Sequence, residues 1–322
     1  MKNTHVAHIL KNKNILEERF RILKEIRNFF WEQKFLEVET PIVGLPGQEP
    51  YLSPMSLYIH DEKNEKYRAY LHTSPEYSMK KMLAAGFENI FSICKCFRDN
   101  ESFGGTHNPE FTMIEWYRVN TDFYKIMDDV EKLINKLDSN VKKFKRVHMR
   151  DLWKEYVGID LDGYLEREKM LELCIERGQK ADKEERYEDL FYRIFLNAIE
   201  PKLIDPIIIH HYPASMAALA KISEDDSNYA ERFEVYLNGM EIANAFTELT
   251  DADEQFSRLK EEQDLRGKLG KEVYKIDMDF VDAVGKIPRC SGIALGVDRL
   301  VQVLTGCQNI DDVLVLPASK VF

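Results

Sequence analysis

The sequence predicts an α+β fold in which an antiparallel β-sheet is flanked by helices. Short strand-like runs are spread along the chain, and they do not alternate with helices in the regular way that produces a parallel sheet. Two of these runs flank Asn238-Gly239, the dipeptide favoured in a two-residue type I′ hairpin. The 322 residues are 44% hydrophobic, which is enough for an extensive core and excludes a disordered chain.

The N-terminal part is predicted to contain a long amphipathic helix at residues 15–35. Its apolar stripe recurs at steps of three and four and includes one arginine: Leu16, Phe20, Leu23, Arg27 and Phe30. The next run, residues 35–40, is predicted to be a strand that ends before Pro41, because proline cannot donate to a β-ladder.

The remaining elements follow from the same two periodicities. Strands are predicted at residues 67–72, 90–97 and 110–118, and helices at 75–86, 122–137 and 165–200. The hairpin strands 231–237 and 240–246 come next, followed by a helix at 250–262 and a glycine-rich strand that runs into a helix at 291–305. Residues from about 138 to 230 read as a charged, glycine-poor insert.

The composition narrows the classes of function. With 45 basic and 56 acidic side chains the net charge is −11, which argues against broad nucleic-acid binding. No apolar run is long enough to cross a membrane, and the N-terminus lacks the apolar core of a secretory signal. Five cysteines without a C-x-x-C pair predict a reduced, cytoplasmic compartment and no zinc site.

The first chemical motif consists of residues 97–101 (FRDNE) and 107–111 (HNPEF), which are predicted to end and begin two strands joined by a glycine-containing loop. Arg98 lies in the first segment. Its planar, permanently charged side chain is suited to bidentate phosphate binding. The motif therefore predicts a polyphosphate site, and the alternative is a hairpin with surface ion pairs.

The second motif consists of Glu234, Glu241 and Glu248, which are seven residues apart. Since Tyr236 faces Glu241 across the predicted turn, Glu234 and Glu241 share one face of the sheet. Two carboxylates on one face repel each other unless a cation lies between them, and oxygen ligands favour Mg²⁺. Glu248 has the wrong parity and joins them only if a bulge or turn intervenes near residues 244–246. The alternative is a set of solvent-facing glutamates.

The third motif is residues 292–300 (GIALGVDRL). Its small residues allow a ligand to approach the backbone closely. Arg299, at the start of the following helix, is expected to contact phosphate or to stack on a base. The alternative is close packing of the helix on the sheet.

Together, these motifs resemble those of the class II aminoacyl-tRNA synthetases. The helix that ends in FLEVETP is similar to motif 1, FRDNE…HNPEFTMIEWYR to motif 2 and GIALGVDRL to motif 3. HTSPEY, HNPEFTMIEWY and GMEIANAFTELTDA resemble the lysine branch of that class. The resemblance covers residues from about 15 to 320 and implies the class II synthetase catalytic fold.

Within the lysine branch, the chain is similar to the elongation factor P–(R)-β-lysine ligase family of free-standing paralogues. Only about 14 residues precede motif 1, too few for an anticodon-binding domain. Residues 211–223 (HYPASMAALAKIS) and Ala294, where tRNA-charging enzymes usually carry glycine, also resemble this family. We therefore expect residues 1–322 to form a single catalytic domain with an insert at about 138–230.

The resemblance implies ATP and Mg²⁺ as co-substrate and metal. Arg98 would hold the α-phosphate, Phe111 would stack on adenine, and Arg299 would cover its other face and reach the γ-phosphate. Glu234 and Glu241 would bind Mg²⁺. Motif 2 is one residue longer than usual, so either Asn100 or Glu101 can contact adenine, and Glu101 is favoured. The remaining residues implied for the ATP site are Asn108, Glu241, Ile242 and Gly296.

The resemblance also implies a site for an amino acid with two ammonium groups. Ser74 and Glu76 would line its amino end, where Glu76 would pair with an ammonium. Tyr117 and Glu248 would hold the distal ammonium. The other residues implied for this site are Asn244 and Ala294.

The implied reaction is ATP-dependent activation of (R)-β-lysine as an acyl-adenylate and its transfer to a lysine side chain of elongation factor P, with no tRNA or membrane partner. The alternatives are an enzyme that passes α-lysine to tRNA or another acceptor, a related amide-forming enzyme, and a non-catalytic sensor. Because motif 1 builds the subunit interface in this class, we expect a homodimer that buries Phe29, Phe30 and Trp31.

Overall fold

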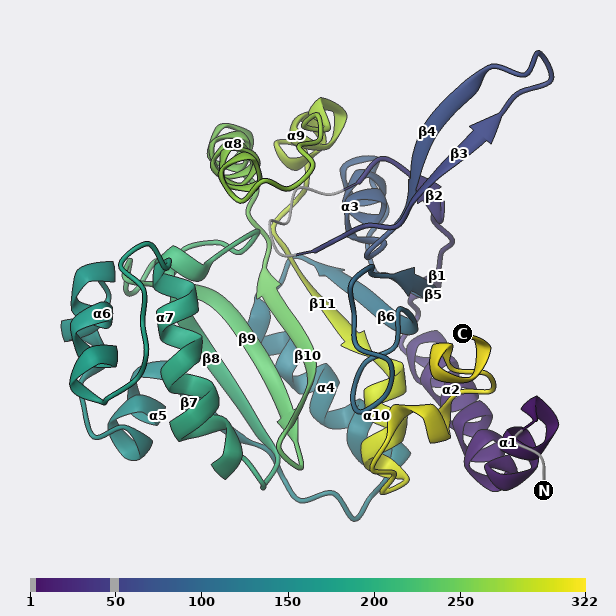
Figure 1. The fold of residues 1–322 in the computed structure, drawn as a ribbon, viewed down its shortest axis with the longest axis horizontal. Helices are drawn as coiled ribbons and strands as arrows, with labels where there is room; N and C mark the ends of the chain where they lie inside the picture. Colours follow the sequence, from purple (N-terminus) through teal and green to yellow (C-terminus); the bar gives the residue numbers. More distant parts are fainter. Residues whose placement is uncertain (1–3, 47–51) are drawn as a thin grey trace. The chain divides into compact units, whose positions relative to one another are not determined.

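The computed structural model describes residues 4–46 and 52–322. The chain divides into two compact units, one formed by residues 1–120 and 250–322 and the other by residues 121–249. Both are mixtures of helices and largely antiparallel sheet (Figure 1), which confirms the predicted α+β class. The prediction of a single catalytic domain stays a prediction.

The first unit contains strands β1 (Leu36–Glu37), β5 (Ile90–Phe97), β6 (Glu110–Val119) and β11 (Cys290–Gly296), in the order β1-β5-β6-β11. β1 runs parallel to β5, and the other neighbours are antiparallel. The strands expected at 90–97, 110–118 and the start of 291–305 are confirmed. The strand expected at 35–40 is reduced to two paired residues, extended by one hydrogen bond from the Val38 amide to Phe91 at 2.8 Å.

Helix α2 (Lys13–Glu32) covers one face of these strands. Phe30 packs against Phe91 and Trp116, with ring centroids 5.0 and 4.9 Å away. The buried residues of α2 are Leu16, Arg19, Ile22, Ile26, Phe29 and Phe30.

The predicted stripe on α2 is therefore wrong in detail. Phe20, assigned to it, is 54% exposed, whereas Arg19 is buried. The reason is an ion pair between Arg19 and Asp298 at 2.5 Å, which brings a charged side chain into the core. Phe29 and Phe30 also lie in the chain's own core, contrary to the expectation that a second subunit buries them.

The opposite face of the same strands is covered at one end by helices α3 (Glu76–Ala84), α8 (Ala252–Lys268) and α9 (Met278–Val284). Their apolar side chains pack around Ile90 and Tyr117. A small sheet with the order β2-β4-β3 projects beside them (Figure 1). Its strands are β2 (Val43–Gly44), β3 (Ser56–His60) and β4 (Lys66–Leu71).

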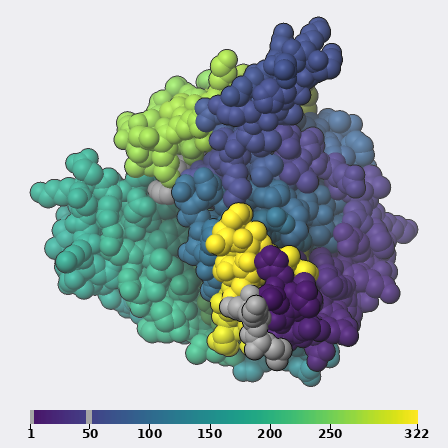
Figure 2. Space-filling model, turned by 45° about the vertical axis from the view of Figure 1, so that its right-hand side comes forward, coloured from purple at the N-terminus to yellow at the C-terminus, as the bar shows by residue number. Residues whose placement is uncertain are grey.

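The two ends of the described chain lie side by side in the first unit (Figure 2). Helix α1 (His5–Lys11) contacts the segment that follows α10 (Val297–Leu304) and ends in α11 (Ala318–Val321). His5 and His8 contact the carbonyls of Lys320 and Leu314 at 3.0 and 3.1 Å.

The second unit has strands in the order β10-β9-β8-β7: β10 (Met240–Thr247), β9 (Tyr229–Leu237), β8 (Ile207–Pro213) and β7 (Lys145–His148). Only the β7–β8 pair is parallel among these neighbours. Its helices are α4 (Phe123–Leu137), α5 (Met149–Tyr156), α6 (Arg167–Glu176) and α7 (Tyr187–Ile194). The shorter helical turns among the described residues are η1 (Leu161–Tyr164), η2 (Phe195–Ile199), η3 (Glu200–Lys202), η4 (Ala214–Met216) and η5 (Ile310–Val313).

The hairpin prediction is confirmed. Asn238 and Gly239 have φ angles of 51° and 76°, as a type I′ turn requires, and Met240 pairs with Leu237. The helix expected at 165–200 is interrupted between α6 and α7, where Gly178 adopts a φ of 70°. None of the helices in the described part of the chain is both long and apolar enough to span a bilayer.

Candidate active site

The central strands of the first unit carry a row of polar and small side chains on the face away from α2. The strand register places Glu115 of β6 between Ser92 of β5 and Ala294 of β11. One step along, Tyr117 lies between Ile90 and Gly292. We call this surface the Glu115 face. Predicted residues Tyr117 and Ala294 share it, because side chains two residues apart on a strand point the same way.

A buried charge cluster lies at this face. The Tyr117 hydroxyl donates a hydrogen bond to Glu115 Oε2 at 3.0 Å, while Glu115 Oε1 has no hydrogen-bond partner among the described residues. On α3, Lys80 pairs with Glu76 at 2.7 Å, and the Lys80 side chain is 1% exposed. Burial raises the pKa of Glu115 well above its usual value, and the charge of Glu76 raises it further. The Tyr117 hydrogen bond and the Lys80 ammonium act in the opposite direction.

The cluster has two carboxylates and only one ammonium. A second ammonium, supplied by a ligand, would let Glu115 ionise and would give Oε1 a partner. Sequence reasoning identified Glu76 but missed Glu115 and Lys80. Both had a local signal: Glu115 has the strand parity of Tyr117, and Lys80 is one helical turn after Glu76. Ser74 accepts a weak hydrogen bond from the Glu76 amide at 3.4 Å, so it lies at the start of the same helix.

Arg98, predicted to bind phosphate, directly follows the other end of β5. Its guanidinium carbon is 5.0 Å from the centre of the Phe111 ring. Its Nε is buried and has no hydrogen-bond partner among the described residues. A buried donor without a partner is costly, so this end of the face suits an anionic oxygen.

Arg299, at the start of α10, contacts the loop between β5 and β6. Its Nε donates to the Thr106 carbonyl at 3.2 Å, and a terminal nitrogen lies 2.8 Å from Nε2 of His107. Burial and the Arg299 charge lower the pKa of His107, so its ring is neutral and can accept this hydrogen bond. Arg299 therefore holds this loop between β5 and β6 in place and remains partly exposed.

Asn108 fixes the base of that loop. Its side-chain NH₂ donates to the Glu110 carbonyl at 2.6 Å, and its oxygen accepts from the Ala318 amide at 2.9 Å. Asn108 is thus buried in a structural link to α11, and the nucleotide contact expected of it stays a prediction.

The two candidates for the adenine-contacting role differ in placement. Asn100 is exposed, with a φ of 62°. Glu101 is partly buried and close enough to His107 to oppose the lowering of its pKa. Gly296 is half-buried at the end of β11, on the Glu115 face, opposite Met113.

In the second unit, Glu234 lies at the centre of a hydrogen-bonded network. Its Oε1 accepts from Arg232 at 2.8 Å and from the Tyr192 hydroxyl at 3.2 Å, and its Oε2 accepts from Tyr236 at 2.9 Å. Arg232 also donates to Asn244 at 3.2 Å. Sequence reasoning missed Arg232, whose positive charge neutralises Glu234 without a metal.

The register of the hairpin shows on which face of the sheet Glu234, Glu241 and Glu248 lie. Glu241 faces Tyr236, so Glu234 and Glu241 share a face as predicted. A bulge lies between Glu241 and Ala243, two residues before the predicted region, and its extra residue is the buried Ile242. The bulge places Asn244 opposite Glu234.

This shift also changes the parity of Glu248. Asn244 lies opposite Glu234 and therefore on the same side of the sheet. Glu248 follows four residues later, just beyond the end of β10, so it has the same parity as Asn244 and Glu234. Glu248 is 2% exposed and forms an isolated bridge with Ala220. Being buried, it is not one of the solvent-facing glutamates of the alternative reading.

The carboxylates of Glu234 and Glu241, on their shared face of the hairpin, are compatible with a Mg²⁺ site. Three of the roughly four lone-pair positions of the Glu234 carboxylate are already used, so Glu234 could offer a metal at most one more contact. Glu241 is partly buried, and its carboxylate could supply a second oxygen ligand.

Comparison with known proteins identifies the family. The family model of tRNA synthetases class II (D, K and N) matches residues 5–320. An elongation factor P–(R)-β-lysine ligase of Avibacterium paragallinarum is 41% identical over 307 residues, which are 93% of this chain and 94% of the relative. The chain belongs to this ligase family within the class II synthetases.

Two further members of the ligase family are similar over most of their lengths. The protein so named from Yersinia enterocolitica is 39% identical over 324 residues, 98% of this chain and 96% of its own. That of Pasteurella multocida is 40% identical over 301 residues, 92% of each chain. The predicted family and the class II fold are therefore confirmed.

Proposed function

We propose that this protein uses ATP to activate (R)-β-lysine as an acyl-adenylate and then transfers it to a lysine side chain of elongation factor P. Relatives about 40% identical over most of the chain carry the name of this ligase. The structural observation that supports it most directly is the buried cluster of Glu76, Lys80 and Glu115, because a cationic ligand would allow the buried Glu115 carboxyl to ionise.

In the first step, a carboxylate oxygen of the amino acid attacks the α-phosphorus of ATP, and pyrophosphate leaves. The carboxylate is already ionised at neutral pH, so this step needs no general base. Catalysis then consists of positioning and charge stabilisation. Arg98 is assigned to the α-phosphate because its buried Nε has no hydrogen-bond partner in the described part of the chain, and Phe111 is assigned to the adenine ring.

Arg299 is assigned to the distal phosphates. Its hydrogen bonds to Thr106 and His107 fix the guanidinium relative to the loop between β5 and β6. A preorganised cation costs little reorganisation during the reaction. Mg²⁺ would be held by Glu241 with one contact from Glu234, and it would neutralise phosphate charge.

In the second step, the side-chain amine of the acceptor lysine attacks the acyl carbon, an amide bond forms and AMP leaves. The amine must lose a proton before or during the attack. We assign no residue of this chain to that proton transfer.

The experiment that tests the proposal is ATP–pyrophosphate exchange with α-lysine and with both β-lysine enantiomers. We expect exchange to be fastest with (R)-β-lysine. Transfer is then measured with elongation factor P and with tRNA as acceptors. Absence of exchange with every lysine isomer, or transfer to tRNA in place of elongation factor P, would refute the assignment.

We also propose that the protein acts as a cytoplasmic homodimer. On α2, Phe20 and Trp31 are 54% and 51% exposed, and Leu36 beside them in sequence is 53% exposed. Large apolar side chains exposed along motif 1 suit a two-fold interface. Sedimentation at micromolar concentration should give twice the 37.8 kDa chain mass, and a monomer would contradict the proposal. The five cysteines are free, as a reducing compartment favours.

A further inference from the structure

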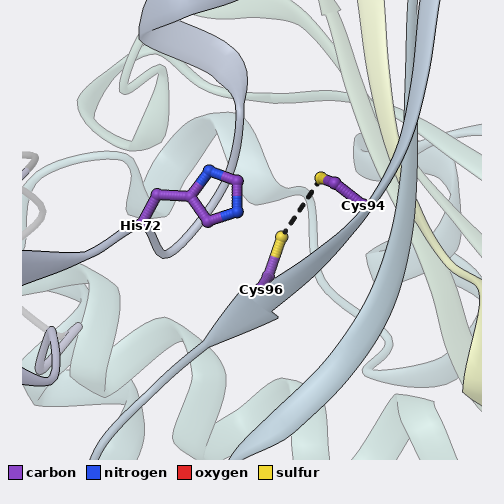
Figure 3. A group of neighbouring side chains, drawn as sticks. All are labelled: His72, Cys94 and Cys96. Atoms are coloured by element: carbon purple, nitrogen blue, oxygen red, sulfur yellow. Dashed lines mark hydrogen bonds between the residues drawn. The ribbon is translucent and has the colours of Figure 1, made fainter. Parts of the chain in front are cut away.

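Three side chains that the proposed reaction does not use lie together at the edge of the Glu115 face. They are His72, which directly follows β4, and Cys94 and Cys96 of β5 (Figure 3). One ring nitrogen of the histidine and the two sulfur atoms all lie within 4.8 Å of one another. In Figure 3 the imidazole ring faces the two sulfur atoms.

The spacing of the two sulfur atoms fits a tetrahedral metal. Cys94 Sγ and Cys96 Sγ are 3.8 Å apart. Two thiolates bound to zinc at about 2.3 Å with a tetrahedral angle between them are also separated by about 3.8 Å. The two cysteines reach this spacing because residues two apart on a strand point to the same face. The histidine nitrogen needs only a small approach to complete three ligands.

The backbone holds the histidine in place. The His72 amide donates to the Ile42 carbonyl at 2.8 Å, and its carbonyl accepts from the Phe97 amide at 3.0 Å. These bonds fix the residue between its own segment and the end of β5. Nε2 of the ring lies 2.5 Å from the Lys95 carbonyl, between the two cysteines in sequence. Metal binding exchanges this contact for a bond to the metal.

We propose that His72, Cys94 and Cys96 form a binding site for Zn²⁺. Two sulfur ligands and one imidazole are the donors that zinc prefers, and three protein ligands leave a fourth position for water or another ligand. On binding, the thiol protons of Cys94 and Cys96 are released to solvent and both sulfurs bind the metal as thiolates. This site could not be predicted from the sequence, because the chain has no C-x-x-C pair and His72 precedes Cys94 by 22 residues.

The location of the site predicts a consequence for the reaction. Cys96 pairs directly with Phe111 and Cys94 with Met113 across β5 and β6. Zinc held on this face lies beside the residue assigned to adenine, so it slows adenylate formation. This consequence rests on the proposed function, whereas metal binding itself does not.

Cobalt provides the binding test because it replaces zinc and reports its ligands by absorption. The full-length protein, freed of metal and kept reduced with a non-chelating phosphine, is titrated with Co²⁺. We expect one equivalent to bind, with thiolate-to-cobalt charge-transfer bands in the near ultraviolet and tetrahedral d–d bands in the visible. Added Zn²⁺ should abolish both. Absence of the charge-transfer bands overturns the proposal.

Matched variants test the ligands one at a time. Cys94→Ser, Cys96→Ser and His72→Asn should each weaken Co²⁺ binding by more than about 100-fold, beyond the effect of residues that only support a ligand. Cys307→Ser is the control, because its partly buried thiol accepts a hydrogen bond from Thr305 in the same unit but lies outside the cluster. Thermal unfolding of each variant verifies that it is folded. Equal loss of binding in the control, or none in Cys96→Ser, refutes the ligand assignment.

The functional consequence is tested separately by pyrophosphate exchange. The ratio of rates with a zinc chelator and with added Zn²⁺ is measured for the wild type and for Cys96→Ser. We expect inhibition that the chelator reverses in the wild type, and a ratio near one in the variant. If exchange is absent under all conditions while cobalt binds, the proposed function fails and the metal site stands. If cobalt binds and Zn²⁺ leaves the exchange unchanged, the predicted inhibition is wrong.

Discussion

Ala294→Gly removes one methyl group from the Glu115 face, and we expect it to relax the choice between α-lysine and (R)-β-lysine. Ala294 lies directly opposite Glu115 in the antiparallel pair of β11 and β6. The Cβ atoms of such a pair are about 5 Å apart. Its neighbours Ile293 and Leu295 point to the other face, where they are 2% and 0% exposed. The methyl group therefore lies where an ammonium bound to Glu115 would contact it.

The magnitude follows from the size of the change. The two lysines are isomers, so they differ in where the first ammonium is placed relative to the carboxylate and not in total size. One methyl group in a packed site is worth about 1–3 kcal/mol, or roughly 10- to 200-fold in selectivity. Ala294 is only partly buried, so we expect a change toward the lower end of this range. The wild type should favour (R)-β-lysine, and the variant should gain activity with α-lysine.

The assay is kcat/KM for pyrophosphate exchange with both isomers in both proteins. Glycine within a strand costs about 0.5–1 kcal/mol of stability, so a matched control is needed. Ala69→Gly removes a methyl group from β4 of the same unit, where Ala69 is 6% exposed. Both variants should lower Tm, but only Ala294→Gly should change the ratio of the isomers.

An unchanged isomer ratio in Ala294→Gly, accompanied by a lowered Tm, would refute this reasoning. Ala294 would then only pack the strand against its surroundings. That result would remove Ala294 from the substrate site and would weaken the argument for β-lysine at the same time.

Four other substitutions test separate parts of the proposal. Arg98→Ala should slow pyrophosphate exchange by roughly 10²–10³ without unfolding the protein, because it removes a preorganised charge at the reacting phosphate; near-normal exchange would refute the role. Glu115→Gln should raise the KM for the amino acid by roughly 10- to 100-fold through loss of a charged hydrogen bond. Because the pKa of Glu115 is raised, the wild-type KM should also increase as the pH falls, and a matching increase in the variant would assign that dependence to another group. Glu241→Ala should shift the Mg²⁺ titration of the exchange reaction, and an unaltered titration would exclude it as a ligand. Burial lowers the pKa of His210 to about 3 and that of His211 to about 4, below the unfolded value of about 6.5. Their contribution to stability is therefore complete above pH of about 6.5 and is lost as the pH falls toward 3–4. His210→Gln should flatten the acid side of the plot of Tm against pH, and parallel plots would contradict this.

Local patterns were sufficient where neighbours in sequence decide the structure. The Asn238-Gly239 turn fixed the hairpin register, and the register fixed the shared face of Glu234 and Glu241. The bulge at Ile242 had no such signal. Alternation of side chains along a strand does not reveal an extra residue, because both parities on β10 contain apolar side chains.

The parts that sequence reasoning missed are mostly buried charges with distant partners. Arg19 pairs with Asp298, which is far away in the chain, and this pair rotates the buried stripe of α2 by one residue. Arg232 lies two residues from Glu234, on the same side of β9, but it reads as an ordinary polar position of an amphipathic strand. Charged residues are usually assigned to the surface, and this rule fails where an ion pair replaces water.

The hydrogen-bond partners of Arg232 and Glu115 distinguish a buried charge with a structural role from one that a ligand would pair. The buried guanidinium of Arg232 is held by Glu234, Asn244 and the Met216 carbonyl. Glu115 differs, since only one of its oxygens has a hydrogen-bond partner among the described residues and Lys80, whose charge lowers its pKa, is paired with Glu76. A carboxylate in this state either stays protonated or takes up a cation. Since the neighbouring residues of β11 on this face are Ala294 and Gly292 rather than basic residues, we expect the cation to come with the substrate, as an amino group.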